Sequence, residues 1–275
     1  MTTSVPTITL NNGARIPQLG FGVFQVPDAE TTEAVTSALD AGYRSIDTAA
    51  IYANEVGVGK ALAASDIERG ELFITTKLWN ADQGYDATLT AFDASLAKLG
   101  LEYIDLYLIH WPTPARDLYR ESWKAIEKLV SDGLVRTAGV SNFQPAHLRR
   151  LLESASLVPA VNQIELHPGL QQNELRALHA ELGIATEAWS PLAQGAVLGD
   201  DAITSIAAHH GKSPAQVVLR WHLQLGNIVI PKSVTPTRIG ENIDVFGFAL
   251  TDDEMAAIAA LDRGLRTGPD PDTLN

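Results

Sequence analysis

The sequence contains no cysteine, which excludes disulfides, thiol catalysis and every cysteine-based zinc site. Any metal would have to be held by histidines and carboxylates. The chain also lacks a run of about 18 apolar residues, and its first residues, Met1–Pro6, have neither the basic head nor the apolar block of a signal peptide. These absences predict a soluble, cytoplasmic protein.

Basic residues are also few, with 20 Lys and Arg against 33 Asp and Glu and a formal net charge of -13. An acidic surface repels polyanions, so nucleic acid and anionic membranes are not expected as partners. A local group of basic residues is more informative in such a chain than it would be in a basic protein.

Strand-like and helix-like segments alternate along the 275 residues, of which 45% are hydrophobic. Eight segments have the composition of buried strands: Gln18–Gly22, Tyr43–Asp47, Leu72–Lys77, Asp105–His110, Val135–Val140, Ala160–Ile164, Ile184–Trp189 and Ile228–Ile230. Amphipathic helical patterns lie between them: Asp28–Ala41, Glu55–Ala64, Ala87–Leu99, Glu121–Asp132, Ala146–Ser154, Asn173–Leu182 and Pro214–Leu225. This alternation predicts an α/β fold in which one domain, residues 1–275, forms a (β/α)8 TIM barrel.

Two additions to the barrel are expected at its ends. Ile8–Ile16 resembles a β-hairpin that caps the barrel, because Asn12-Gly13 favours a type I′ turn between two short apolar runs. Thr251–Leu261 predicts an extra C-terminal helix with Thr251 as its N-cap.

Three strand candidates end in groups able to carry chemistry: Asp47, Tyr52, Lys77 and His110. The C-terminal strand ends of such a barrel meet at one mouth, where these enzymes keep their active sites. A phenol, with a pKa of about 10, would become a better acid beside the ammonium group of Lys77, since a positive neighbour lowers its pKa. Each residue alone also fits a structural role, but together they suit protonation of a carbonyl oxygen during hydride transfer.

Several motifs resemble the aldo-keto reductase superfamily over about residues 8–261. They are Gly42-Tyr-Arg-Ser-Ile-Asp-Thr-Ala49, Asn54-Glu55, Ile104-Asp-Leu-Tyr-Leu-Ile-His-Trp-Pro112, Gly139-Val-Ser-Asn-Phe143, Val161-Asn-Gln-Ile-Glu-Leu-His-Pro168 and Ile230-Pro-Lys-Ser233. Within the superfamily the chain is most similar to the prokaryotic 2,5-diketo-D-gluconate reductase group, through Thr48-Ala-Ala-Ile-Tyr52, Thr75-Thr-Lys-Leu-Trp-Asn80 and His110-Trp-Pro-Thr-Pro114.

The resemblance implies NADPH-dependent reduction of aldehydes and ketones, including dicarbonyls and keto sugars. Tyr52 would be the general acid, Lys77 and Asp47 would tune it, and His110 would orient the carbonyl. The same resemblance implies that Ser141, Asn142 and Gln163 bind the nicotinamide carboxamide, and that Trp189 stacks on the ring, where many relatives have Tyr.

A basic segment, Pro231–Arg238, follows the eighth strand candidate, where barrels frequently bind phosphate. Lys232, Ser233 and Arg238 are therefore expected to bind the 2′-phosphate of NADPH, unless they form only a solvated surface. The resemblance adds Glu241 and Asn242 against the adenine and Leu192, Gln194 and Gly195 along the pyrophosphate. Further residues expected to line the cofactor are Gly22, Val23, Ser190 and Val234.

The substrate is expected to be a small carbonyl compound bound within an apolar collar of Phe24, Trp79 and Trp111. The segment Pro112–Leu118 and the tail Arg266–Asn275 are both short, which predicts an open pocket. No assembly signal is present, so a monomer is expected.

Other interpretations have less support in the sequence. Gly57-Val-Gly59-Lys60 has neither Rossmann nor Walker spacing. Five histidines lack metal-ligand spacing, so they are read as packing or surface residues and no metal is expected: His167, His179, His209, His210 and His222. Two rival functions stay open, a cofactor-sensing regulatory subunit and a metal-dependent barrel hydrolase.

Overall fold

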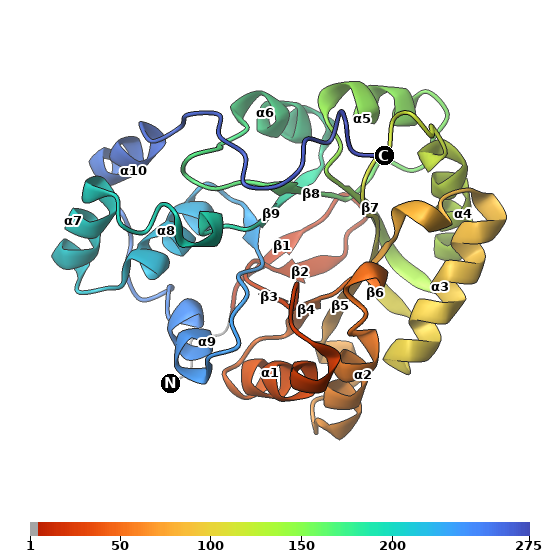
Figure 1. The fold of residues 1–275 in the computed structure, drawn as a ribbon, viewed down its shortest axis with the longest axis horizontal. Helices are drawn as coiled ribbons and strands as arrows, with labels where there is room; N and C mark the ends of the chain where they lie inside the picture. Colours follow the sequence, from red (N-terminus) through yellow and green to blue (C-terminus); the bar gives the residue numbers. More distant parts are fainter. Residues whose placement is uncertain (1–4) are drawn as a thin grey trace.

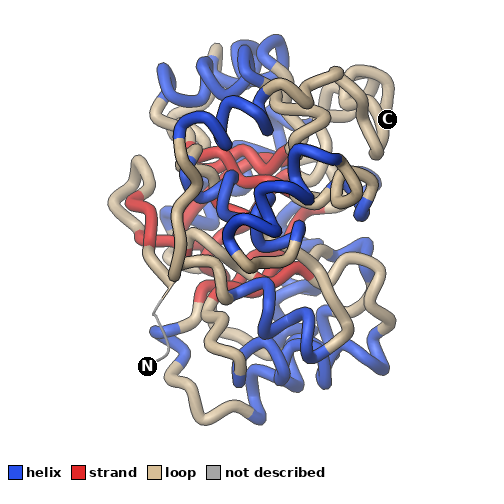
Figure 2. Tube along the Cα trace, turned by 90° about the vertical axis from the view of Figure 1, so that its left-hand side faces the viewer, coloured by secondary structure: helices blue, strands red, loops and turns tan. Residues whose placement is uncertain are grey.

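The computed structural model describes residues 5–275, and its strands form one closed barrel surrounded by helices (Figures 1 and 2). The eight parallel strands follow the chain order around the barrel: β3 (Phe21–Gly22), β4 (Ser45–Asp47), β5 (Phe73–Leu78), β6 (Ile104–Ile109), β7 (Val135–Ser141), β8 (Val161–Glu165), β9 (Ala185–Trp189) and β10 (Ile228–Val229). Each lies within a residue or two of a segment expected from the sequence, except that β3 begins three residues later than predicted.

The barrel closes between its first and last strands through backbone hydrogen bonds. The amide of Val229 donates to Gln18 O at 3.0 Å, and the amide of Gly20 donates to Val229 O at 2.8 Å. One further hydrogen bond, from Gly22 N to Pro231 O at 3.1 Å, extends this pairing of the first and last strands to their C-terminal ends. The (β/α)8 fold predicted from the alternating pattern is confirmed.

Helices surround the strands, so that strands lie inside and helices outside in both views. The helices are α1 (Asp28–Asp40), α2 (Glu55–Ala64), α3 (Tyr85–Leu99), α4 (Tyr119–Ser131), α5 (Pro145–Leu152), α6 (Asn173–Leu182), α7 (Asp201–His210), α8 (Pro214–Gln224), α9 (Pro236–Ile243) and α10 (Asp252–Ala259). The sequence pattern did not predict α7 or α9. The signals for α7 were present, because Asp200 caps the helix at Ala202 N and buried Ile203, Ile206 and Ala207 have helical spacing.

The N-terminal hairpin is confirmed, with β1 (Thr7–Thr9) antiparallel to β2 (Arg15–Pro17) and Ile8 opposite Ile16. The prediction of a type I′ turn was wrong. That turn needs positive φ at both central residues, but only Gly13 has it, at +85°. The bonds Gly13 N to Leu10 O and Leu10 N to Ala14 O enclose a three-residue loop, in which a left-handed glycine follows an ordinary turn.

The hairpin covers the N-terminal end of the barrel. A separate apolar cluster packs Leu10 and Ile16 of the hairpin against five strand residues, Phe73, Leu106, Leu108, Val161 and Ile228. With this end filled by apolar side chains, the polar interior lies toward the C-terminal strand ends.

The C-terminal helix is also confirmed as α10, two residues shorter at its end than expected. Thr251 Oγ1 accepts a hydrogen bond from Glu254 N at 3.2 Å, and Glu254 Oε2 accepts one from Thr251 N at 2.8 Å. This reciprocal capping box fixes the start of the helix. Among the helices of residues 5–275, none has the length and apolar character needed to cross a membrane.

Candidate active site

A buried ion pair lies at the C-terminal end of the barrel interior. Lys77 Nζ, from β5, lies 2.5 Å from Asp47 Oδ1 at the end of β4 and donates to Thr48 O at 2.8 Å. Burial alone would lower the pKa of the Lys77 ammonium, but Asp47, Tyr52 and Glu187 together outweigh burial and raise it. Lys77 is therefore a fixed positive charge inside the barrel.

Tyr52 ends the short 3-10 helix η1 (Ala50–Tyr52), which directly follows β4. The Lys77 ammonium lies 5.2 Å from the centroid of its ring, and the ring of His110 lies 5.7 Å away. Burial raises the pKa of Tyr52 above its ordinary value, and Lys77 opposes that rise without overcoming it. The expected net lowering of this pKa was wrong, because the sequence did not reveal the cost of burying a phenolate.

His110 follows β6 and faces the same space. Its ring lies 5.4 Å from that of Trp79, and its Nδ1 is buried with no hydrogen-bond partner among residues 5–275. Burial and, to a lesser extent, the Lys77 charge hold the pKa of His110 well below its ordinary value. His110 is thus a neutral imidazole at pH 7, able to donate from one ring nitrogen only.

Glu187, which the sequence analysis did not select, extends this polar network. Gln163 Nε2 donates to Asp47 Oδ2 at 2.7 Å and to Glu187 Oε2 at 2.9 Å, so one amide joins two carboxylates. Burial, together with the charge of Asp47, raises the pKa of Glu187 to about 7. The signal for Glu187 in the sequence was an acidic residue inside a strand-like segment, between Thr186 and Ala188.

The raised pKa of Glu187 gives a prediction about stability. A carboxyl whose pKa is raised by folding costs stability as pH rises from about 4.5 to 7, because its charged form is disfavoured in the folded state. Glu187→Gln keeps an oxygen acceptor for Gln163 and removes the charge. We expect the variant to exceed the wild type by about 3 kcal/mol in free energy of unfolding at pH 8 and by under about 1 kcal/mol at pH 5. Urea denaturation at both pH values measures this, and a pH-independent difference would contradict it.

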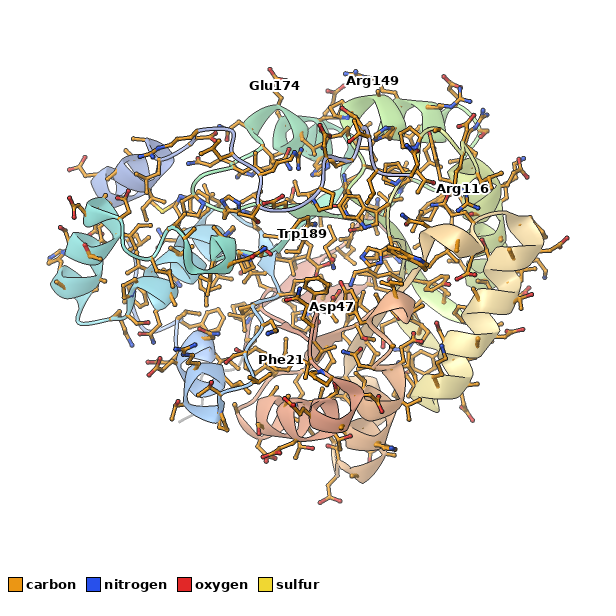
Figure 3. The ribbon with its side chains drawn as sticks, in the orientation of Figure 1. Phe21, Asp47, Arg116, Arg149, Glu174 and Trp189 are labelled. Atoms are coloured by element: carbon orange, nitrogen blue, oxygen red, sulfur yellow. The ribbon has the colours of Figure 1, made fainter. Side chains whose placement is uncertain are left out.

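The four expected nicotinamide-binding residues, Ser141, Asn142, Gln163 and Trp189, form one connected group. Asn142 Nδ2 donates to His110 O at 3.0 Å, and Asn142 Oδ1 accepts from Trp189 Nε1 at 2.8 Å. Ser141 Oγ lies 3.1 Å from Asn142 Nδ2 and donates to Gln163 O at 2.8 Å. Figure 3 places Trp189 and Asp47 near the centre of the barrel view. The indole of Trp189 is held by its edge and keeps part of its surface exposed.

The segment after β9 has an unusual backbone. Ser190, Ala193 and Gln194 have φ of +46°, +49° and +53°, and Gly195 follows with +94°. Left-handed conformations at non-glycine residues cost energy and concentrate at ligand sites. Amide groups in such a turn can form a concave anion-binding surface, so this segment fits a pyrophosphate strap. Leu192 is partly buried against the core, whereas the Gln194 side chain is exposed.

The basic segment lies between β10 and the end of α9. Lys232 and Arg238 are exposed and make no ion pair among residues 5–275, although the chain is strongly acidic. Ser233 Oγ accepts from Thr235 N at 3.1 Å, next to the start of α9, where no side chain caps the free amides. Val234 and Glu241 are exposed, and Asn242 is buried. The segment therefore presents two free cations beside a helix N-terminus.

Aromatic rings surround Tyr52 and His110. The Phe24 ring lies 5.0 Å from that of Tyr52, and the Trp111 ring lies 6.3 Å from His110 and 6.4 Å from Trp189. Phe24 is half exposed, at 50%, as expected for the rim of a pocket. Gly22 pairs with Asp47 across the sheet, and Val23 is completely buried, so Val23 can reach a cofactor only through its backbone.

The C-terminal tail lies along one side of this region, and the expectation of an open pocket stays a prediction. Thr267 N and Oγ1 donate to Glu165 Oε1 at 2.5 and 2.7 Å, and Gly268 N donates to Glu165 Oε2 at 3.2 Å. Asn275 Oδ1 accepts from Ala115 N, in the segment after β6, at 2.7 Å. A Cβ at residue 268 would lie 2.4 Å from Trp189, so glycine lets the tail pass against the indole.

Three of the five histidines that the sequence analysis assigned to packing or the surface do have a packing role. His167, His179 and His222 are buried and contact Glu165, Asn162 and Pro191 O respectively. Among residues 5–275, no three histidine or carboxylate ligand atoms converge at the mouth of the barrel. The geometry thus gives no support to a metal-dependent hydrolase.

The comparisons with known proteins agree with this geometry. The Aldo/keto reductase family profile matches residues 18–263. An aldo-keto reductase of Mycolicibacterium smegmatis is 59% identical over 270 residues, 98% of each chain, and "Methylglyoxal reductase DkgA" of Yersinia pestis is 55% identical over 272 residues, also 98% of each chain. The crystal structure of a Gox0644 mutant in complex with NADPH superposes with a TM-score of 0.95 at 50% identity, over 99% of this chain and 100% of that chain. The chain belongs to the aldo/keto reductase family of oxidoreductases.

Proposed function

We propose that this protein reduces aldehydes and ketones to alcohols with NADPH. The observation that carries the proposal is the convergence of Tyr52, His110 and the buried Lys77–Asp47 pair at one end of the barrel. A carbonyl oxygen that gains an electron pair needs an acid, a hydrogen-bond donor and a nearby positive charge. Tyr52, His110 and Lys77 respectively offer these three groups. The methylglyoxal reductase among the relatives supports the same class of reaction.

NADPH, when bound, supplies the hydride that adds to the carbonyl carbon. Tyr52 gives its phenolic proton to the carbonyl oxygen, and its raised pKa keeps that proton in place at neutral pH. Lys77 stabilises the phenolate that is left, and Asp47 keeps the ammonium charged and oriented. His110, being neutral, donates a hydrogen bond that orients the carbonyl oxygen without competing for the proton.

The residues present fit a nicotinamide cofactor. Trp189, held at its edge by Asn142, offers a ring face for stacking, and Ser141, Asn142 and Gln163 offer polar atoms for the carboxamide. Leu192, Gln194 and Gly195, with Ser190, would hold the pyrophosphate on their left-handed backbone. Lys232, Ser233 and Arg238 would hold the 2′-phosphate, with Glu241 and Asn242 against the adenine; Gly22, Val23 and Val234 complete the lining.

The proposed substrates are small carbonyls that fit between Phe24, Trp79 and Trp111. Dicarbonyls and keto sugars, as reduced by the 2,5-diketo-D-gluconate reductase group, are the class we favour. The polar centre inside an aromatic collar suits a second oxygen on the substrate.

The direct test is NADPH oxidation, followed at 340 nm, with methylglyoxal, phenylglyoxal, a nitrobenzaldehyde and a 2,5-diketo sugar acid, repeated with NADH. We expect steady multiple turnover with NADPH on at least one dicarbonyl, unchanged by EDTA. Tight NADPH binding without turnover on any carbonyl would favour the cofactor-sensing subunit instead. Loss of activity in EDTA would favour a metal enzyme.

Lys232 and Arg238 give a separate prediction about the cofactor. A charge-assisted hydrogen bond is worth about 1.5–3 kcal/mol, so Lys232→Ala and Arg238→Ala are each expected to raise the KM for NADPH about tenfold or more. The KM for NADH, which lacks the 2′-phosphate, should change little. Lys60→Ala is a matched control, because Lys60 is an exposed lysine on α2 without an ion pair among the described residues. Equal losses with both cofactors would contradict this assignment.

A further inference from the structure

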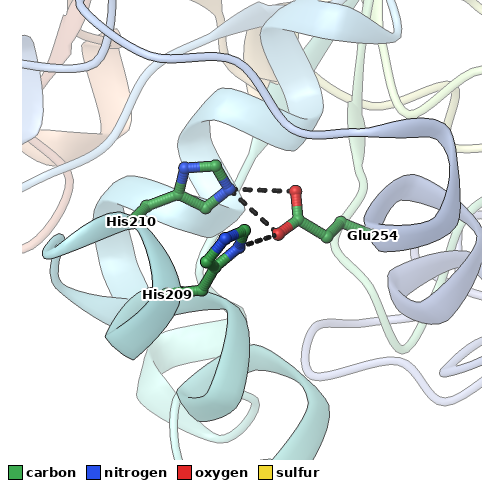
Figure 4. Close-up of side chains that lie close together, drawn as sticks. All are labelled: His209, His210 and Glu254. Carbon is green, nitrogen blue, oxygen red and sulfur yellow. Dashed lines mark hydrogen bonds and ion pairs between the residues drawn. The ribbon is translucent and has the colours of Figure 1, made fainter.

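Three potential metal ligands meet far from the barrel mouth, where α7 and α10 lie beside each other (Figure 4). His209 and His210 are the last two residues of α7, and Glu254 lies in the first turn of α10. His209 Nδ1 lies 2.9 Å from Glu254 Oε1, and His210 Nε2 lies 3.0 and 2.9 Å from the two Glu254 oxygens. One ligand atom from each residue falls within 4.8 Å of the other two.

Neighbouring residues of a helix normally point about 100° apart, so this convergence needs an explanation. The two imidazoles use different nitrogens. His209 presents Nδ1, close to its backbone, whereas His210 presents Nε2, at the far end of its ring. Their ring centroids lie only 4.8 Å apart, so Nδ1 of His209 and Nε2 of His210 reach the same carboxylate.

The carboxylate is held in place by its own helix. Glu254 Oε2 accepts a hydrogen bond from Thr251 N at 2.8 Å as part of the capping box of α10. His210 is also fixed, because its ring packs 5.3 Å from that of Phe248. Two of the three donors are thus positioned before any ion binds, which lowers the entropy cost of binding.

We propose that His209, His210 and Glu254 bind one divalent zinc-type ion that fastens α10 to α7. Two imidazoles and one carboxylate match the donor preference of Zn²⁺, whereas Ca²⁺ and Mg²⁺ prefer oxygen donors alone. Zinc bonds of about 2.0–2.2 Å need only small side-chain shifts from the present spacing, and water completes the tetrahedron. The sequence could not reveal the site, because its two halves lie 44 residues apart along the chain.

The site has a structural consequence for the tail. Residues after α10 lead to Arg263, whose amide donates to Gly169 O at 3.1 Å, and then to the Thr267 contacts with Glu165. Fastening α10 would therefore fix one end of the segment that contacts Glu165 and passes against Trp189. The ion itself would take no part in the reaction.

The test uses untagged, EDTA-treated full-length protein titrated with Zn²⁺ by calorimetry and with Co²⁺ by absorption spectroscopy. We expect one ion per chain with a Kd in the micromolar range or below, visible Co²⁺ bands of four-coordinate type, and a Tm several degrees higher with Zn²⁺ than with EDTA. His209→Ala, His210→Ala and Glu254→Gln are each expected to weaken Zn²⁺ binding at least tenfold.

Glu254→Gln also removes the charge that faces both histidines, so each variant is compared with itself with and without Zn²⁺. Lys212→Ala is the matched control. Lys212 lies two residues beyond His210 and pairs with Asp244 instead, so this variant should keep wild-type Zn²⁺ affinity. Millimolar binding, several ions per chain, or unchanged affinity in His210→Ala would overturn the proposal.

Discussion

Replacing Tyr52 by phenylalanine is expected to lower kcat for carbonyl reduction by about 10²- to 10⁴-fold, which is the usual contribution of a positioned general acid. The change removes one oxygen atom from a partly exposed ring. The ring contacts with Phe24 and His110 stay available, so substrate and cofactor affinity should change little. Steady-state kinetics with NADPH and methylglyoxal, together with a thermal unfolding curve, measure both parts of the prediction.

Tyr107→Phe is the matched control for this experiment. Tyr107 lies on β6 with its ring 5.2 Å from that of Phe92, and its hydroxyl is buried without a hydrogen-bond partner among the described residues. Removing that hydroxyl should preserve turnover and leave stability equal or slightly higher, since an unsatisfied buried polar group is costly. If Tyr52→Phe retains wild-type turnover, the proposed proton donor is wrong.

The pH dependence provides an independent check on Tyr52. Burial raises the pKa of this phenol above its ordinary value of about 10, so reduction should lose its acid only at strongly alkaline pH. Over pH 6–9 no fall in kcat/KM assignable to Tyr52 is expected. A fall near pH 8 that disappears in Tyr52→Phe would show that Lys77 dominates over burial.

The fold was predictable because its local signals agree with one another. Each long buried strand, such as β5 or β6, is rich in apolar, aromatic and β-branched residues, and each is followed by an amphipathic helix. The failures have local causes. The α7 helix is a short, alanine-rich segment with few large apolar residues, and the Asn12-Gly13 pair suits more than one hairpin loop.

The candidate site was predictable only in part. Asp47, Lys77 and His110 lie at or next to strand ends, so parallel topology alone brings them together. The bonds from Gln163 to Asp47 and Glu187, and from Glu165 to the tail, join residues that are 24 to 116 positions apart. No periodic pattern encodes such pairings, because they depend on how side chains fill the closed barrel.

Lys77→Met is expected to reduce the free energy of unfolding by about 3–5 kcal/mol, the largest stability effect of any single change considered for this chain. Lys77 is completely buried and is the cation nearest to Asp47, at 2.5 Å. Methionine fills most of its volume, so the loss would come from charge rather than from a cavity. Without Lys77 the Asp47 carboxylate would remain buried, and among residues 5–275 only the amide of Gln163 would be left as a direct partner. Urea denaturation at pH 8 gives the difference.

The same reasoning predicts that adding Asp47→Asn to Lys77→Met recovers part of the lost stability, because the double variant removes the unpaired charge along with its partner. Lys124→Met is the surface control: the exposed Lys124–Glu121 pair is worth at most about 1 kcal/mol. If Lys77→Met lowers the free energy of unfolding no more than this control does, the buried pair does not stabilise the fold. A double variant less stable than Lys77→Met alone would mean that packing, not charge, determines the effect. Lys77 has one role in stability, as the partner of Asp47, and one in turnover, as the charge that stabilises the Tyr52 phenolate. Recovery of stability without recovery of turnover would separate these roles, since a barrel that lacks both charges can fold but cannot stabilise the phenolate.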